Sequence, residues 1–242
     1  MAQEITFQPL GLDRGRDTEL ASDSPGDPLP DGTTTMRVGL SGSDKRRVLV
    51  EFDLTGSRYG VAGVPHGSLV ESASLSLTCT SAALSASACT VYSLEPGVRV
   101  LPSVQTWTDQ DTSTDWLTEG GDFDRAGGVA STLPTSTGAW EIDGLESLAQ
   151  SALDSNDGIL SLMVRKDNEA SGAAQATFSR CVAASGWPSL TVTYSPRPAA
   201  TASTSDPPED PTAVGGLTGT ILWGADRIGS SVIVGDSTPA DP

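Results

Sequence analysis

The fold of this chain is decided by one alternating stretch, Arg47-Val48-Leu49-Val50-Glu51-Phe52-Asp53. Val48, Val50 and Phe52 share one face of an extended chain, because successive side chains of a strand point to opposite sides. β-Branched and aromatic residues in strict alternation are typical of a strand that lays one face on a core. The sequence therefore predicts its strongest strand over residues 47–54.

Similar short runs recur on both sides of this stretch, separated by turn-forming residues. The segments that they predict as strands are 34–40, 69–80, 90–94, 138–142, 158–165, 174–180 and 189–194. Many short strands with turn signals between them are typical of a sandwich or barrel. We expect an all-β fold, an antiparallel, jelly-roll-like β-sandwich over residues 36–194.

One helix interrupts the strand pattern. Asp143 and Glu146 have the spacing of a capping box, and apolar residues then recur at helical spacing up to Leu153. A second short helix over residues 97–105 is a weaker signal. The sequence thus predicts one short helix between two strands of the sandwich.

The two ends of the chain carry extensions. Residues 1–35 are predicted to be an N-terminal arm, in which Ile5, Phe7, Leu10 and Leu12 alternate as one strand would. Residues 195–212 are rich in Pro, Ser and Thr, which is the composition of a linker. Residues 213–242 are predicted to form a C-terminal β-hairpin around a turn at 224–227.

The charge of the chain excludes two classes of partner. Lys and Arg number 14 against 31 Asp and Glu, for a net charge of −17. Nucleic-acid binding and binding to an anionic membrane both require basic patches, so neither is expected. No run of 18 apolar residues marks a membrane span. The first residues lack the basic and apolar regions of a secretory signal peptide, so either a signal has been replaced by an initiator Met or the protein is used without export by that route.

The three cysteines, Cys79, Cys89 and Cys181, are an odd number and do not make a complete disulfide framework. A bridge between Cys79 and Cys89 across a hairpin and buried reduced thiols both remain open. No CxxC pair is present, and His66 is the single histidine, so the sequence predicts no zinc site.

The motifs follow one another in a fixed order. Arg-x-Leu-x-x-Phe-Asp and Ala-x-Leu-x-Leu come first, then Trp107, Thr-x-Trp and Gly-Gly-Asp, then Trp-x-x-Asp before the helix, and finally Phe-Ser-Arg and Pro-x-Leu-x-Val-x-Tyr. They occupy residues 47–53, 73–77, 107, 114–116, 120–122, 140–143, 178–180 and 188–194. This order resembles the DNRLRE-type domain, a family related to carbohydrate-binding β-sandwich modules. The chain departs from that pattern at Leu153, where the family usually has a Trp nearby, and at Cys181, where it often has an acidic residue.

The resemblance implies a function without catalysis. Such domains occur on secreted or cell-wall proteins and in virion proteins of tailed bacteriophages. Together with the N-terminus, it leads us to expect a virion protein assembled in the host cytoplasm, such as a capsid decoration (cement) protein. Its partners would be other virion subunits, and a homo-oligomer is expected. The alternative is an extracellular or cell-surface carbohydrate-binding adhesion module, or one on a tail fibre.

Candidate residues follow from these two functions. Trp107 and Trp116 would contact a glycan, although structural plugs at the sandwich edge are the favoured interpretation. The partner interface would be the apolar hairpin, with Leu217, Ile221, Trp223, Ile228, Val232 and Ile233. That hairpin would dock either on its own sandwich or on another chain, because an isolated hairpin is marginal in water.

Other residues suggest chemistry only weakly. Five aspartates at 109, 111, 115, 122 and 124 crowd one loop that would suit calcium, but a solvated acidic loop is favoured. Glu119 and Asp122 would suit glycoside hydrolysis, but this chain has many such carboxylate pairs. His66 would suit a Ser-His-Asp triad, but no Gly-x-Ser-x-Gly motif for the nucleophile accompanies it. Lys45, Arg46 and Arg47 are expected to be solvated at a strand edge. We therefore expect no catalytic residue, cofactor or metal.

Overall fold

The alternating stretch forms the greater part of β4 (Asp44–Asp53), a long strand in the middle of the sheet. β4 pairs along one edge with β2 (Arg16–Ala21) and along the other, in succession, with β3 (Thr35–Ser41) and β9 (Ile159–Lys166). The structure is a computed structural model that describes residues 1–8, 16–56, 62–155 and 157–196. All of these residues belong to one unit, Met1–Ala199.

The described residues form eleven strands and one helix. The remaining elements are β1 (Gln3–Phe7), β5 (Leu69–Ser81), β6 (Ala88–Ser93), β7 (Val129–Thr132), β8 (Gly138–Asp143), β10 (Ala174–Ser179), β11 (Ser189–Ser195) and α1 (Glu146–Asp154). The strand order is β1-β11-β5-β10-β3-β4-β9-β6-β7, with β2 added to β4 and β8 added to β5. Every described pair is antiparallel.

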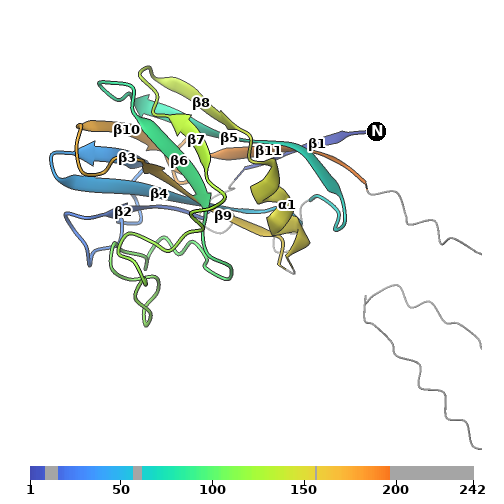
Figure 1. Cartoon of the computed structure of the whole chain (residues 1–242), viewed down its shortest axis with the longest axis horizontal. Helices are drawn as coiled ribbons and strands as arrows, with labels where there is room; N and C mark the ends of the chain where they lie inside the picture. Colours follow the sequence, from blue (N-terminus) through green and yellow to red (C-terminus); the bar gives the residue numbers. More distant parts are fainter. Residues whose placement is uncertain (9–15, 57–61, 156, 197–242) are drawn as a thin grey trace, which may run out of the picture. The chain divides into compact units, whose positions relative to one another are not determined.

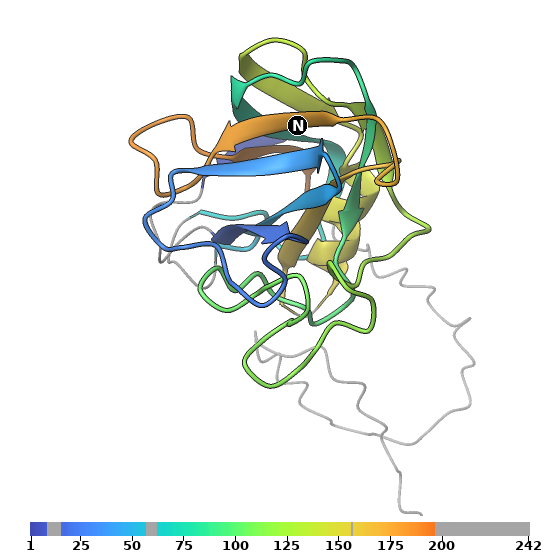
Figure 2. The same ribbon diagram turned by 90° about the vertical axis from the view of Figure 1, so that its left-hand side faces the viewer.

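The sheet curls on itself, so that strands far apart in its order face one another (Figures 1 and 2). The main core fills the space inside the curl. Val48, Val50 and Phe52 of β4 lie in it, together with residues of most other strands and of α1. Trp140 of β8 stacks on Phe178 of β10 with ring centroids 5.2 Å apart. The predicted all-β, sandwich-like fold is confirmed.

The strands overlap all eight segments predicted from alternation. β1 contains Ile5 and Phe7 of the strand expected in the arm, whose Leu10 and Leu12 lie outside the described residues. The expectation that residues 1–35 form an arm is wrong for the part that the structure describes. β1 pairs with β11, and β2 pairs with β4 over six residues, so both strands belong to the sheet. β2 and β7 (Val129–Thr132) are the described strands that alternation did not predict.

The helix α1 lies against β5 and β9 (Figure 1). Its apolar face buries Leu148, Ala149, Ala152 and Leu153, as the helical spacing predicted. The expected capping box is absent, because Asp143 ends β8 and the N-cap is Leu145, which makes no side-chain cap hydrogen bond. The second helix predicted over residues 97–105 is also wrong, since that segment combines turns with irregular backbone.

A long connection, residues 94–128, joins β6 to β7 without a strand or helix of its own (Figure 1). It covers the outer face of β2, β4 and β9 and completes a second, smaller apolar core. The members of this core are Leu20, Leu49, Leu94, Val100, Trp107, Trp116, Phe123 and Met163. β4 is thus buried on both faces. Connections of this length usually carry a function or need extensive anchoring.

No helix within the described residues is long and apolar enough to cross a membrane. The predicted linker beyond Pro196 and the predicted C-terminal hairpin, with its interface residues Leu217 to Ile233, lie outside the described residues.

Candidate functional site

Arg180 and Asp17 form a fully buried ion pair between the end of β10 and strand β2, with exposed fractions of 1% and 0%. Nε of Arg180 donates to Oδ1 of Asp17 at 3.0 Å, and the terminal nitrogens donate to the carbonyls of Asp17 and Thr33 at 2.8 and 3.0 Å. The backbone N–H of Cys181 donates to Oδ2 of Asp17 at 2.6 Å. The last residue of the Phe-Ser-Arg motif therefore links the end of β10 to β2 through a buried ion pair. We call such a buried ion pair a brace.

Glu51 of β4 is a second brace, and it holds the β6–β7 connection to the sheet. Its carboxylate accepts two hydrogen bonds from Arg99, at 2.7 and 2.9 Å. It also accepts the N–H of Val100 at 2.9 Å and the hydroxyl of Ser161 at 3.1 Å. With this many donors around it, the buried carboxylate acts as a structural hydrogen-bond acceptor.

Arg47 is a third brace, at the far side of the same connection. Its guanidinium donates to Glu169 at 2.9 and 2.6 Å and to the carbonyl of Gly120 at 2.7 Å, and it lies 4.6 Å from the ring of Trp107. Gly120 has φ +85°, and a Cβ there would lie 2.8 Å from the Trp107 ring, so only glycine fits.

The basic residues Lys45, Arg46 and Arg47 were expected to be solvated, and for two of them this is wrong. Arg46 and Arg47 are 7% and 6% exposed. Because successive residues of β4 face opposite sides, Arg47 reaches the long connection, whereas Arg46 pairs with Glu19 at 3.2 Å and with Asp23.

Trp107 and Trp116, the predicted glycan contacts, are 4% and 5% exposed and belong to the second core. The indole N–H of Trp116 donates to the carbonyl of Thr106 at 2.9 Å. Stacking on a sugar needs an exposed ring face, which neither side chain offers. The structure therefore supports the favoured interpretation, in which both rings are structural plugs.

The acidic loop divides its aspartates among separate turns. Asp109 accepts the hydroxyls of Thr106 and Thr108, which hold the pKa of its carboxyl below the usual value. Asp122 accepts the N–H groups of Leu117 and Thr118, both at 2.8 Å. In the part of the chain that the structure describes, no three Asp, Glu, His or Cys gather as metal ligands. The carboxylates act here as turn caps.

In the carboxylate pair of Glu119 and Asp122, only Asp122 has a structural role, because it caps the turn at Leu117. Glu119 is exposed. His66 lies exposed in a turn before β5.

All three cysteines are buried and free, so Cys79 and Cys89 are not bridged. Burial is the main cause that raises the pKa of Cys89 to about 12, and the carboxylate of Asp167 adds to it. Burial also raises the pKa of Cys181 to about 12, helped by the charge of Asp17. Cys79 and Cys89 act as small apolar side chains of the main core, whereas the thiol of Cys181 donates to Oδ1 of Asp17 at 3.1 Å.

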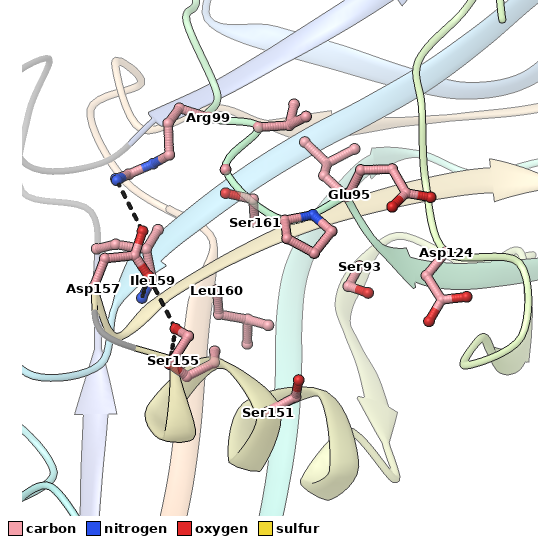
Figure 3. Close-up of a pocket in the computed structure, with 15 residues that line it drawn as sticks. Ser93, Glu95, Arg99, Asp124, Ser151, Ser155, Asp157, Ile159, Leu160 and Ser161 are labelled. Atoms are coloured by element: carbon pink, nitrogen blue, oxygen red, sulfur yellow. Dashed lines mark hydrogen bonds and ion pairs between the residues drawn. The ribbon is translucent and has the colours of Figure 1, made fainter. Parts of the chain in front are cut away.

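A cavity of about 320 Å³ lies between α1, the start of β9 and the first residues of the long connection. Its apolar lining includes Leu94, Pro96, Ala152 and Leu160. Figure 3 shows the Arg99–Asp157 ion pair at one end of this cavity. At the other end, the carboxylates of Glu95 and Asp124 flank the hydroxyl of Ser93 (Figure 3). We call this cavity the α1 pocket.

The charges at the two ends of the α1 pocket differ. Arg99 is neutralised by Glu51 and by Asp157, whose Oδ2 lies 3.6 Å from it. Glu95 and Asp124 are exposed and form no ion pair with a described Lys or Arg. The pocket therefore combines an apolar lining with net negative charge at one end.

Sequence patterns did not point to the α1 pocket, because three segments distant in the chain build it. Asp124 was noted as a member of the acidic loop, but its position beside Ser93 depends on the antiparallel bridge between Leu94 and Phe123. A second cavity, of about 460 Å³, lies beside Arg37 and Arg46, whose charges are already compensated by Glu19 and Asp23. No family model and no curated protein matches this chain.

Proposed function

We propose that this chain is a non-enzymatic structural protein of a tailed bacteriophage virion, a capsid decoration protein or another surface-exposed subunit. The observation that carries the proposal is that the buried charged side chains form ion pairs within the fold. Asp17, Glu19, Glu51, Arg47 and Arg180 all form ion pairs that tie strands to one another or fasten connections to the sheet. A domain built this way is suited to bearing load and presenting surfaces.

The described domain would act as the rigid body of this subunit. Because β1 and β2 are paired within the sheet, the part of the chain that would clamp neighbours is the C-terminal segment beyond Pro196. Its sequence carries Leu217, Ile221, Trp223, Ile228, Val232 and Ile233 behind a Pro-rich linker. Burial of such side chains against another subunit would contribute several kcal/mol, at about 25 cal/mol per Å² of apolar surface.

The resemblance to DNRLRE-type domains supports a binding or building role and is compatible with a virion. The carbohydrate-binding alternative depended on Trp107 and Trp116, and their burial removes the exposed aromatic pair on which it was based. We therefore propose the structural role alone.

The proposed clamp predicts that the full chain self-associates and that a chain ending at Pro196 does not. Light scattering on the two proteins measures this directly. We expect an oligomer for residues 1–242 and a monomer for residues 1–196, because the shorter chain keeps every described strand and loses the apolar segment.

The melting temperature of the truncated protein serves as the control, and it should stay within a few degrees of that of the full chain. Monomers of equal stability in both cases would contradict self-association through residues 197–242.

A further inference from the structure

We propose that the α1 pocket is a docking site for a lysine- or arginine-bearing segment of a neighbouring protein. The inference rests on the proposed function in one respect, namely that the neighbour is another subunit of the particle. The site itself is argued from its shape, lining and charge.

The lining of the pocket suits the aliphatic part of a long basic side chain. Leu94, Ala152 and Leu160 expose little of their surface, and together with Pro96 they provide apolar walls. Lys and Arg lay their methylene stems along such surfaces and keep their charged ends at the polar edge. A cavity of about 320 Å³ is large enough for one such side chain and part of its backbone.

The charged end of the guest would meet Glu95 and Asp124. Asp124 Oδ1 accepts the N–H of Ala126 at 2.8 Å, which orients the carboxylate without neutralising it. The adjacent cation, Arg125, lies over the ring of Phe123, with 5.4 Å between its Cζ and the ring centroid. The two carboxylates are therefore left for a cation from outside, and they flank the hydroxyl of Ser93 (Figure 3).

The opposite end of the pocket does not repel such a guest. Arg99 donates two hydrogen bonds to Glu51 and lies near Asp157, so its positive charge is compensated from two sides. Arg99 therefore forms a wall at this end of the pocket, and its charge is already compensated within the fold.

The charge of the whole chain selects a basic partner over the other candidates. A net charge of −17 attracts a basic segment at long range and repels both a free anion and a second copy of this surface. Among the described residues that line the pocket none is aromatic, so they offer a sugar no stacking platform.

The test is an NMR titration of the full chain with an acetylated and amidated octapeptide that contains two lysines among glycines. We expect the largest shifts at backbone amides of residues 93–99, 124–126 and 151–161. The same peptide with both lysines acetylated should bind at least tenfold more weakly, because the charge-assisted contacts are lost. Equal binding of the two peptides would overturn the proposal.

Two variants separate the pocket from the general acidity of the protein. Glu95→Gln with Asp124→Asn should weaken lysine-peptide binding about tenfold. Glu4→Gln with Glu71→Gln removes the same charge from exposed positions outside the pocket and should change binding less than twofold. Equal weakening by both pairs would mean that the peptide senses only net charge, which would overturn the site.

A charge-neutral variant tests the cavity itself. Ser151→Phe places a ring at an exposed position of the lining and should abolish the shifts while the melting temperature is preserved. Unchanged binding by a folded Ser151→Phe protein would contradict docking in the pocket. These results are independent of the clamp, because loss of peptide binding with intact self-association would refute the docking site alone. Peptide binding without self-association would refute the clamp alone.

Discussion

Replacement of Arg180 by Met should lower the free energy of unfolding by about 3–5 kcal/mol, the range found when one partner of a buried ion pair is removed. The physical reason is that the carboxyl group of Asp17, which is 0% exposed, would be left buried without its partner. The carbonyls of Asp17 and Thr33 would also lose their donors. Denaturant unfolding of the purified protein, followed by tryptophan fluorescence, measures the change.

A double-mutant cycle gives the matched control for this prediction. Asp17→Asn combined with Arg180→Met removes both charges and should cost clearly less than the sum of the two single replacements. Additive costs, or a loss below 1 kcal/mol for Arg180→Met alone, would contradict the assignment of this pair as a buried brace.

Replacement of Trp107 by Ala should cost about 3–5 kcal/mol, as for other large aromatic residues removed from a core. Trp107 is 4% exposed, belongs to the second apolar core and carries the Arg47 guanidinium 4.6 Å from its ring. We expect the long connection to lose its structure before the rest of the domain unfolds. Gly120 lies in this connection, donates its N–H to the Trp107 carbonyl at 2.6 Å and packs against the ring. Thermal unfolding and amide exchange over residues 94–128 report the two effects.

Trp187 supplies the control for the same chemical change. It is only half-buried, with its indole N–H donated to the carbonyl of Ala183 at 2.6 Å, so Trp187→Ala should cost less than Trp107→Ala. A Trp107→Ala protein with unchanged stability would mean that the ring is free at the surface and would reopen the glycan interpretation.

The strands that the sequence predicted are those whose burial alternates. β5 and β11 bury every second residue over most of their length, and their apolar residues mark the core face directly. β2 gave no such signal, because its buried residues include Asp17 and Glu19. Their burial depends on Arg180, Arg37 and Arg46, which are distant in sequence, and no local pattern encodes those pairs.

The second core explains a further difference between sequence and structure. Alternation in β4 indicated that Leu49 lies on the face opposite Val48, but it did not show that the long connection covers that face. Trp107 and Trp116 are recognisable as landmarks in the sequence, whereas their burial depends on how Arg47 and Glu51 fasten the connection. The α1 pocket was missed for the same reason, because contacts between distant segments create it.

The virion assignment is tested most directly by asking whether the protein belongs to purified phage particles. Intact particles from cells that produce the protein would be purified on a density gradient, analysed by mass spectrometry and labelled with an antibody against the described domain. We predict that the chain is present at a stoichiometry comparable to other subunits and that the antibody decorates the particle surface. Particles that lack the chain while the cell lysate contains it in abundance would contradict the proposed function.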